Sequence, residues 1–297
     1  MLQRGEDYLT GPLTGNTAPT EWALQIRKAR RRGVAAPHGI ISRMWKRIRI
    51  TILLLILASV ALETWRAQRT ATSWRDTLQV AVYPINGDGS SAAAQRIQAL
   101  ESDSFVDIEH FFAAEVKRYE VPTLQPVRLN LQQALKTLPP SPPERPGVLD
   151  SMFWSLKMRW WVWRLPPPTL RPNIHLFVVY HDGSAGRVPT SHGLQRGQIA
   201  IAHVFADNVM QRSNAVVIAH ELLHTLGATD KYDPATLEPI YPSGYADPLA
   251  TPRLPQRFCE LMAGRLPGFG APPEQPRSLA QCLIGEQTAR EIGLLRP

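Results

Sequence analysis

Residues 220–230 read His-Glu-Leu-Leu-His-Thr-Leu-Gly-Ala-Thr-Asp, and this stretch decides what fold and chemistry the rest of the chain must support. Apolar and small residues surround it between positions 215 and 226, which predicts a buried helix. Residues four apart share one face of a helix, so we expect His220 and His224 to point the same way. Two neutral imidazoles at this spacing are typical ligands of a zinc ion.

Three further residues complete the predicted site. Glu221 lies beside the first imidazole, where its carboxylate can act as a general base on an attacking water. Gly227 is expected to take the left-handed conformation that ends a helix. The turn after it would bring Asp230 back as the third ligand of one zinc ion. The alternative is a helix whose two histidines are only buried and hydrogen-bonded.

The pattern H-E-x-x-H-x-x-G-x-x-D resembles the zinc signature of the metzincin metallopeptidases. With Asp230 in place of the more common third histidine, and Tyr232 after it, the stretch is similar to the snapalysin-type and immune-inhibitor-A-type branches. The resemblance covers roughly residues 198–265. It implies an α+β fold with a twisted mixed sheet packed on helices, a zinc helix, a Met-turn beneath the metal and a C-terminal helix. Met262 is the candidate for the Met-turn.

The resemblance also implies a function, that of a zinc-dependent endopeptidase acting on a peptide or protein substrate. An edge strand near residues 190–202 would pair with extended substrate. The Pro-rich stretch 231–258 would form the lower wall of the cleft, and a hydroxyl of Tyr232, Tyr241 or Tyr245 would stabilise the oxyanion. Two alternatives remain open, a zinc-stabilised scaffold without catalysis and a zinc amidase acting on a cell-wall substrate.

The charge of the chain is unevenly distributed. The net charge is +8, and residues 1–71 carry all of it, with twelve Lys and Arg against four acids. Residues 72–297 hold 21 basic and 21 acidic side chains. A catalytic domain that binds nucleic acid would carry its own basic face, so we expect no nucleic-acid partner.

An uncharged apolar run, residues 50–62, follows a basic cluster and is flanked by Trp45 and Trp65. This pattern predicts a transmembrane signal anchor over residues 44–66, behind a basic, mostly disordered cytoplasmic tail over residues 1–43. The chain would then cross the inner membrane once, with residues 72–297 as an exported domain in the periplasm or outside the cell. A cleaved signal peptide and a true start at Met44 are the alternatives.

The two cysteines, Cys259 and Cys282, both lie in the predicted exported domain. An even pair in an oxidising compartment predicts one disulfide. It would tie the segment before Met262 to a closing helix over residues 278–295. Two free buried thiols are the alternative.

Between the anchor and the zinc helix, strand and helix patterns alternate. Strands are expected at residues 78–83, 127–131, 174–180 and 197–205. A helix is expected over residues 105–119, with one buried face made of Phe105, Ile108, Phe112 and Val116.

A second helix, expected over residues 148–164, is rich in tryptophan. Its helical spacing favours packing against the sheet by one stripe of side chains, namely Phe153, Leu156, Trp160 and Trp163. The alternative is that three other side chains of this helix, Arg159, Trp161 and Arg164, face a membrane surface.

Overall fold

The computed structural model describes residues 38–143, 147–168, 170–185, 189, 191–194, 198–268 and 273–295. Most of the predicted cytoplasmic tail, residues 1–43, therefore lies outside the described residues. The chain divides into two compact units, residues 1–58 and 59–297. Helix α2 (His38–Ala71) includes the predicted anchor, and its side chains from 45 to 59 are exposed. Within the part of the chain that the structure describes, no helix is long and apolar enough to cross a membrane.

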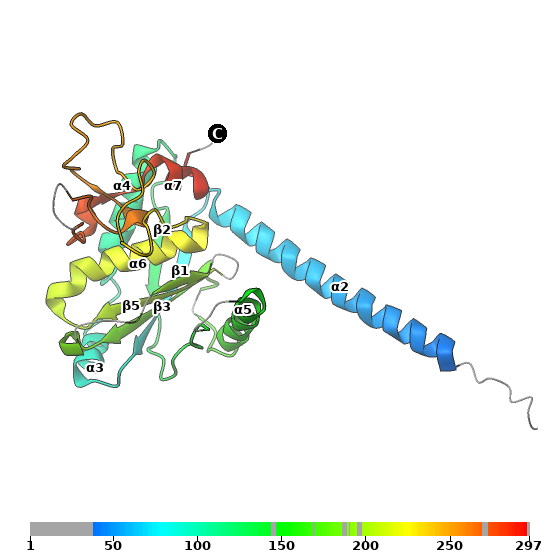
Figure 1. Cartoon of the computed structure of the whole chain (residues 1–297). Coiled ribbons are helices and arrows are strands. Elements are labelled where there is room, and N and C mark those ends of the chain that lie inside the picture. The colour runs from blue at the N-terminus through cyan, green and yellow to red at the C-terminus, as the bar shows by residue number, and fades with distance from the viewer. Residues whose placement is uncertain are drawn as a thin grey trace, which may run out of the picture. The chain divides into compact units, whose positions relative to one another are not determined.

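A five-stranded mixed sheet with the order β2-β1-β3-β5-β4 forms the centre of the second unit (Figure 1). The strands are β1 (Leu78–Asn86), β2 (Val127–Leu131), β3 (Ile174–His181), β4 (His192–Leu194) and β5 (Ile199–Phe205). The first four in that order are parallel, and β4 pairs antiparallel with β5 at the edge. The long strands are buried on both faces, as their continuous apolar runs predict. A mixed sheet covered by helices is compatible with the predicted α+β class.

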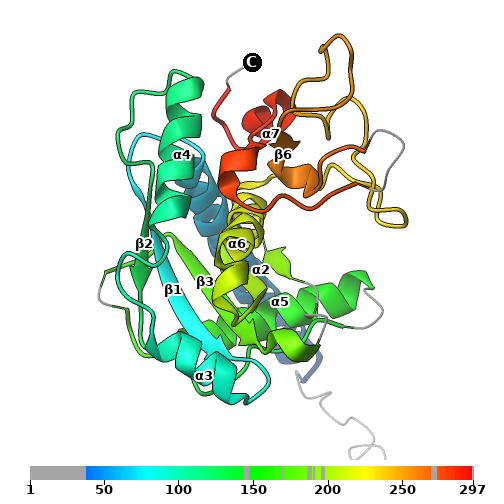
Figure 2. The same ribbon diagram turned by 90° about the vertical axis from the view of Figure 1, so that its left-hand side faces the viewer.

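Helices cover both faces of the sheet, because alternate side chains of each strand point to opposite sides. Helices α3 (Ser91–Gln98), α4 (Val106–Arg118) and α6 (Gln211–Leu226) pack on the face that includes Val80 and Val178. Helix α5 (Val148–Trp163) packs on the other face (Figure 2). The predicted face of α4 is confirmed, since four side chains are buried there: Phe105, Ile108, Phe112 and Val116.

Helix α5 lies at the predicted residues but turns a different side to the sheet. Met158 is fully buried, and the Trp161 ring meets Phe177 edge-on with centroids 4.8 Å apart. The alternative in which Trp161 faces a membrane is therefore wrong, and the predicted packing of α5 on the sheet is confirmed. The stripe predicted to pack on the sheet is instead exposed, at Phe153, Leu156, Trp160 and Trp163. The helix is apolar on two sides, so the spacing of its apolar residues does not identify the packed side.

The predicted closing helix over residues 278–295 is wrong in its extent. The chain forms a 3-10 turn, η5 (Leu279–Gln281), then strand β7 (Cys282–Leu283) and the short helix α7 (Glu286–Glu291). Strand β7 pairs in parallel with β6 (Cys259–Glu260), and this pairing keeps residues 282–283 extended.

The same pairing brings the two cysteines together. Cys259 lies opposite Cys282 in the β6–β7 register, and both thiols are buried and free. Hydrogen bonding with Cys282 and burial raise the pKa of the Cys259 thiol. The predicted bridge is not formed in this structure, although its two partners are neighbours, and it remains a prediction.

Candidate metal centre

Helix α6 carries both candidate imidazoles and ends where the sequence predicts. Gly227 has a φ of 111°, the left-handed conformation that a Cβ disfavours. Its N–H donates to the carbonyl of His224, and the N–H of Ala228 donates to that of Leu223, each at 3.1 Å. The helix therefore ends abruptly and the chain turns back, which brings Asp230 to the two histidines.

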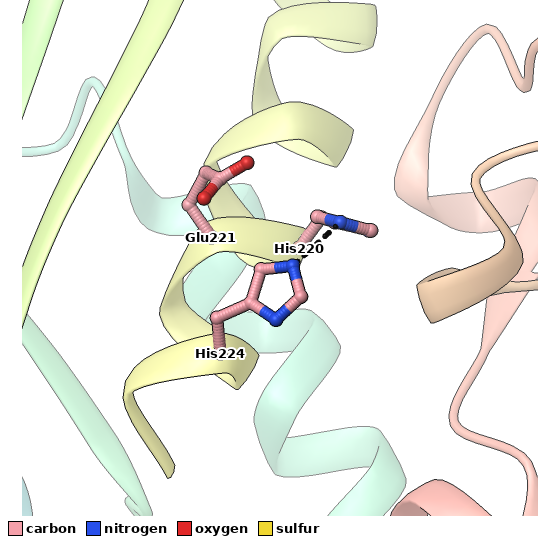
Figure 3. A group of neighbouring side chains, drawn as sticks. All are labelled: His220, Glu221 and His224. Atoms are coloured by element: carbon pink, nitrogen blue, oxygen red, sulfur yellow. Dashed lines mark hydrogen bonds between the residues drawn. The ribbon is translucent and has the colours of Figure 1, made fainter. Parts of the chain in front are cut away.

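Three candidate ligand atoms converge on one point. His220 Nε2 and His224 Nε2 are 3.1 Å apart, and Asp230 Oδ1 lies 3.2 Å from each of them. Figure 3 shows the two imidazoles turned toward one another, with Glu221 beside them on the same helix. Tetrahedral bonds of 2.0–2.1 Å to a zinc ion would put ligand atoms about 3.3 Å apart. The observed spacing is therefore close to that of ligands sharing one metal ion.

Backbone carbonyls hold both imidazoles in the orientation that turns their Nε2 atoms toward the shared position. His220 Nδ1 lies 3.0 Å from the carbonyl oxygen of Leu261, and His224 Nδ1 lies 2.9 Å from that of Ala228. A carbonyl can only accept, so Nδ1 of each ring carries a hydrogen, and a bound metal ion would replace any proton on Nε2 and leave each ring neutral. The Nε2 lone pairs then point to the shared centre, which is the tautomer that a metal ligand needs.

Glu221 is a buried carboxylate with unused hydrogen-bonding capacity. Glu221 is 5% exposed, and its Oε2 has no hydrogen-bond partner among the described residues. The ligating atoms of His220, Glu221 and His224 all lie within 4.8 Å of one another. Burial raises the pKa of Glu221, although the two imidazoles oppose that rise. A buried, unpartnered oxygen is costly to keep, so it fits a group that binds a water or a proton at this site.

The electrostatics of the centre favour a cation. Burial opposes the charged form of His220, but the hydrogen bond to Asp230 and the Glu221 carboxylate outweigh burial and raise its pKa to about 9. The hydrogen bonds from both histidines likewise hold the pKa of Asp230 below its ordinary value, against the effect of burial. Two carboxylates thus surround two imidazoles, and the group can hold a metal ion.

The segment that contains Met262 supports this centre through two hydrogen bonds. Met262 is fully buried in the 3-10 turn η4 (Leu261–Ala263), whose Leu261 carbonyl accepts from His220. The carbonyl of Met262 also accepts a hydrogen bond of 3.0 Å from the N–H of Lys231, next to Asp230. This turn therefore contacts both the helical part and the loop part of the ligand set.

The sequence did not predict Glu260, which is fully buried just before this turn. Its Oε2 accepts from the N–H of Ala263 at 2.9 Å. Its Oε1 accepts from the N–H of Gly285 at 3.1 Å and from the Thr288 hydroxyl at 2.7 Å. Two of these donors lie 25 and 28 residues away in the sequence, so no local pattern signals the role of Glu260.

A second unpredicted contact fixes the loop that carries Asp230. The Lys231 ammonium is 2.8 Å from a Glu291 oxygen on α7, and Glu291 also accepts from the N–H of Thr229 at 2.9 Å. The residues on both sides of Asp230 are therefore held by one carboxylate of the C-terminal helix.

A cavity of about 200 Å³ opens beside His220. Its walls are mostly apolar or small side chains and are formed by Val216, Val217, His220, Tyr232, Leu237, Ala263, Gly264, Arg265 and Gln275. Tyr232 is the one candidate tyrosine in this wall. Tyr241 and Tyr245 instead contact each other, with ring centroids 5.4 Å apart.

Comparison of the chain with known protein families and with curated proteins gave no match. The chemistry of the site is therefore what indicates a function for the chain.

Proposed function

We propose that the chain is a zinc-dependent hydrolase of the metzincin type that cleaves peptide bonds. The observation that carries the proposal is the spacing of 3.1–3.2 Å between the ligand atoms of His220, His224 and Asp230, beside a buried Glu221 oxygen that has no hydrogen-bond partner among the described residues. Zinc is the metal we propose, because two neutral imidazoles and one carboxylate are a common ligand set of catalytic zinc.

In this proposal each polar group has one task. His220, His224 and Asp230 would hold the zinc, which when bound lowers the pKa of water and polarises a carbonyl. Glu221 takes the proton from the attacking water and delivers it to the leaving amine. The raised pKa of Glu221 supports this role, because an acid–base group works best when its pKa approaches the working pH. We assign Tyr232 the hydrogen bond to the oxyanion, since it lines the cavity beside His220.

Strand β4 supports an extended peptide as the substrate. It is the antiparallel edge strand next to β5, and it lies within residues 190–202, where substrate pairing is expected. An extended peptide can add to such an edge through main-chain hydrogen bonds. The cavity beside His220 would then take one substrate side chain.

The test compares the wild-type chain with Glu221→Gln. We expect the variant to keep its zinc, measured by mass spectrometry of the metal, and to lose peptide cleavage by at least about a hundredfold, because the proton acceptor is gone. Glu238→Gln is the matched control, since Glu238 is an exposed carboxylate in the following loop. Full cleavage by Glu221→Gln would contradict the mechanism.

The same assay separates the two other functions. A scaffold would bind zinc, and the wild-type chain would cleave nothing in a peptide library. A cell-wall amidase would release peptide from purified peptidoglycan but leave linear peptides intact.

We also propose that residues 44–66 anchor the chain in the inner membrane, with residues 72–297 on the far side. The support is the uncharged run of residues 50–62 between Trp45 and Trp65, with basic residues ahead of it. After carbonate extraction of membranes, we expect the full chain to stay with the lipid. Protease added from outside spheroplasts should reach residues 72–297.

A further inference from the structure

We propose that helix α5 lies in the headgroup layer of an anionic membrane and inserts one face into the lipid. The face consists of six large apolar side chains, here called the outer stripe: Leu149, Met152, Phe153, Leu156, Trp160 and Trp163. Each is at least half exposed, and Trp163 is 79% exposed. At about 100° per residue these positions share an arc of about 100°, a continuous apolar band along the helix.

The inner side of α5 fixes the direction of the outer stripe. Met158 is fully buried against the sheet, and Trp161 meets Phe177 edge-on. The indole N–H of Trp154 donates to the carbonyl of Pro140 at 2.8 Å. The helix therefore cannot roll to bury the outer stripe without losing this packing.

Cationic side chains border the outer stripe on both sides. By helical position, the exposed Lys157 and Arg164 lie at one margin of the outer stripe and the half-buried Arg159 lies at the other, while the acid of α5 is Asp150 in its first turn. The Arg164 guanidinium lies over the Trp160 ring, 4.7 Å from its centroid. Residues 72–297 carry balanced charge, so this positive border is a local feature of α5.

This arrangement matches a lipid surface more closely than a protein partner. Tryptophan prefers the membrane interface, and long basic side chains at the margin of an apolar band can reach phosphate while their stems remain in the apolar layer. A second copy of the chain would bring the same cations together and repel them. The inference does not depend on hydrolysis, so it can fail or succeed independently of the proposed function.

The test uses the full chain in vesicles of phosphatidylglycerol and phosphatidylcholine that contain a lipid with a photoactivatable acyl chain. Crosslinks are mapped by mass spectrometry. The variant is Leu156→Gln with Trp160→Gln and Trp163→Gln. The matched control replaces three exposed apolar residues outside α5, by Leu124→Gln, Val209→Gln and Leu249→Gln. All six side chains are exposed, and circular dichroism would verify that both variants fold.

We expect crosslinks on residues 148–164 of the wild-type chain, a fall of about tenfold in the variant, and little change in the control. Lys157→Glu with Arg164→Glu should reduce the yield to that seen in pure phosphatidylcholine. The proposal would be overturned if α5 of the wild-type chain gave no higher yield of lipid crosslinks than helix α3. Equal yields in the variant and the control, or protection of the outer stripe by dimers without lipid, would also overturn it.

Discussion

At the scale of the residue, Asp230 distinguishes the candidate centre from a site with three histidines. It is the ligand candidate that comes from a loop, and its carboxylate gives the site negative charge that a third imidazole would not supply. Glu221 is the other carboxylate within reach of the two imidazoles, whereas Asp233 makes contacts elsewhere. Asp233 Oδ1 instead accepts from the N–H groups of Ala235 at 2.7 Å and Thr236 at 3.3 Å, so it stabilises its own turn.

We therefore predict that Asp230→Asn weakens zinc binding by at least about a hundredfold, because a neutral amide replaces a charged ligand. Competition with a chromophoric chelator measures the affinity. Asp233→Asn, the same change three residues later, should bind zinc as the wild type does. Equal affinities for the two variants would show that Asp230 is not a ligand.

At the scale of the element, the point where α6 ends determines whether the following loop can bring Asp230 to the two histidines. Replacing Gly227 with Ala should cost about 1–2 kcal/mol, because a Cβ is disfavoured at a φ of 111°. Urea unfolding measures this cost. Gly89→Ala is the matched control, since Gly89 also has a positive φ, 73°, and open space around it.

Both glycine variants should lose similar stability, but only Gly227→Ala should also weaken zinc binding. The reason is that relief of strain at residue 227 would lengthen the helix and move Asp230 away from His220 and His224. If zinc affinity were unchanged in Gly227→Ala, the turn would not be what positions the third ligand.

Glu260 connects the turn at Met262 to α7, and its loss should affect both elements. Glu260→Ala leaves three donors without their acceptor in a buried place, so we expect a loss of about 3 kcal/mol or more in the free energy of unfolding. Chemical denaturation measures it, with the exposed Glu238→Ala as the control. A loss below about 1 kcal/mol would mean that water replaces the carboxylate.

At the scale of the whole molecule, the free energy of unfolding should depend on pH through His175. This residue lies on the face of the sheet that α5 covers. Its ring stacks on Tyr83 with centroids 6.0 Å apart, and its Nδ1 has no hydrogen-bond partner within the described residues. Burial lowers the pKa of His175 from 6.5 to about 4. Between these values the unfolded chain binds a proton that the folded chain does not.

The free energy of unfolding should therefore fall as the pH drops from about 6.5 to about 4, by up to about 3 kcal/mol from this group alone. Denaturation at a series of pH values measures the slope. His175→Phe should flatten it, whereas His110→Gln, on the exposed side of α4, should leave it unchanged. A slope that survives in His175→Phe would assign the effect to other groups.

Local sequence patterns predicted the strands and helices well where one periodicity dominates. The strand at 127–131, in which Val127 and Leu129 are buried and Arg128 is exposed, and the apolar face of α4 are examples. Prediction was wrong for residues 278–295, where pairing of β7 with β6 overrides the helical pattern, and for α5, where two apolar sides compete. In both cases the deciding partner lies far away in the sequence.

The sequence by itself determined the candidate ligand types, the spacing of the two histidines on one helix and the glycine that ends it, because these depend on local geometry within eleven residues. The tertiary structure alone decided which groups support them. The Leu261 carbonyl bound to His220, the buried Glu260 and the Lys231–Glu291 pair join segments that lie 25 to 60 residues apart. Such contacts form only when the chain is folded, because hydrogen bonds between distant residues depend on packing and leave no periodic trace in the sequence.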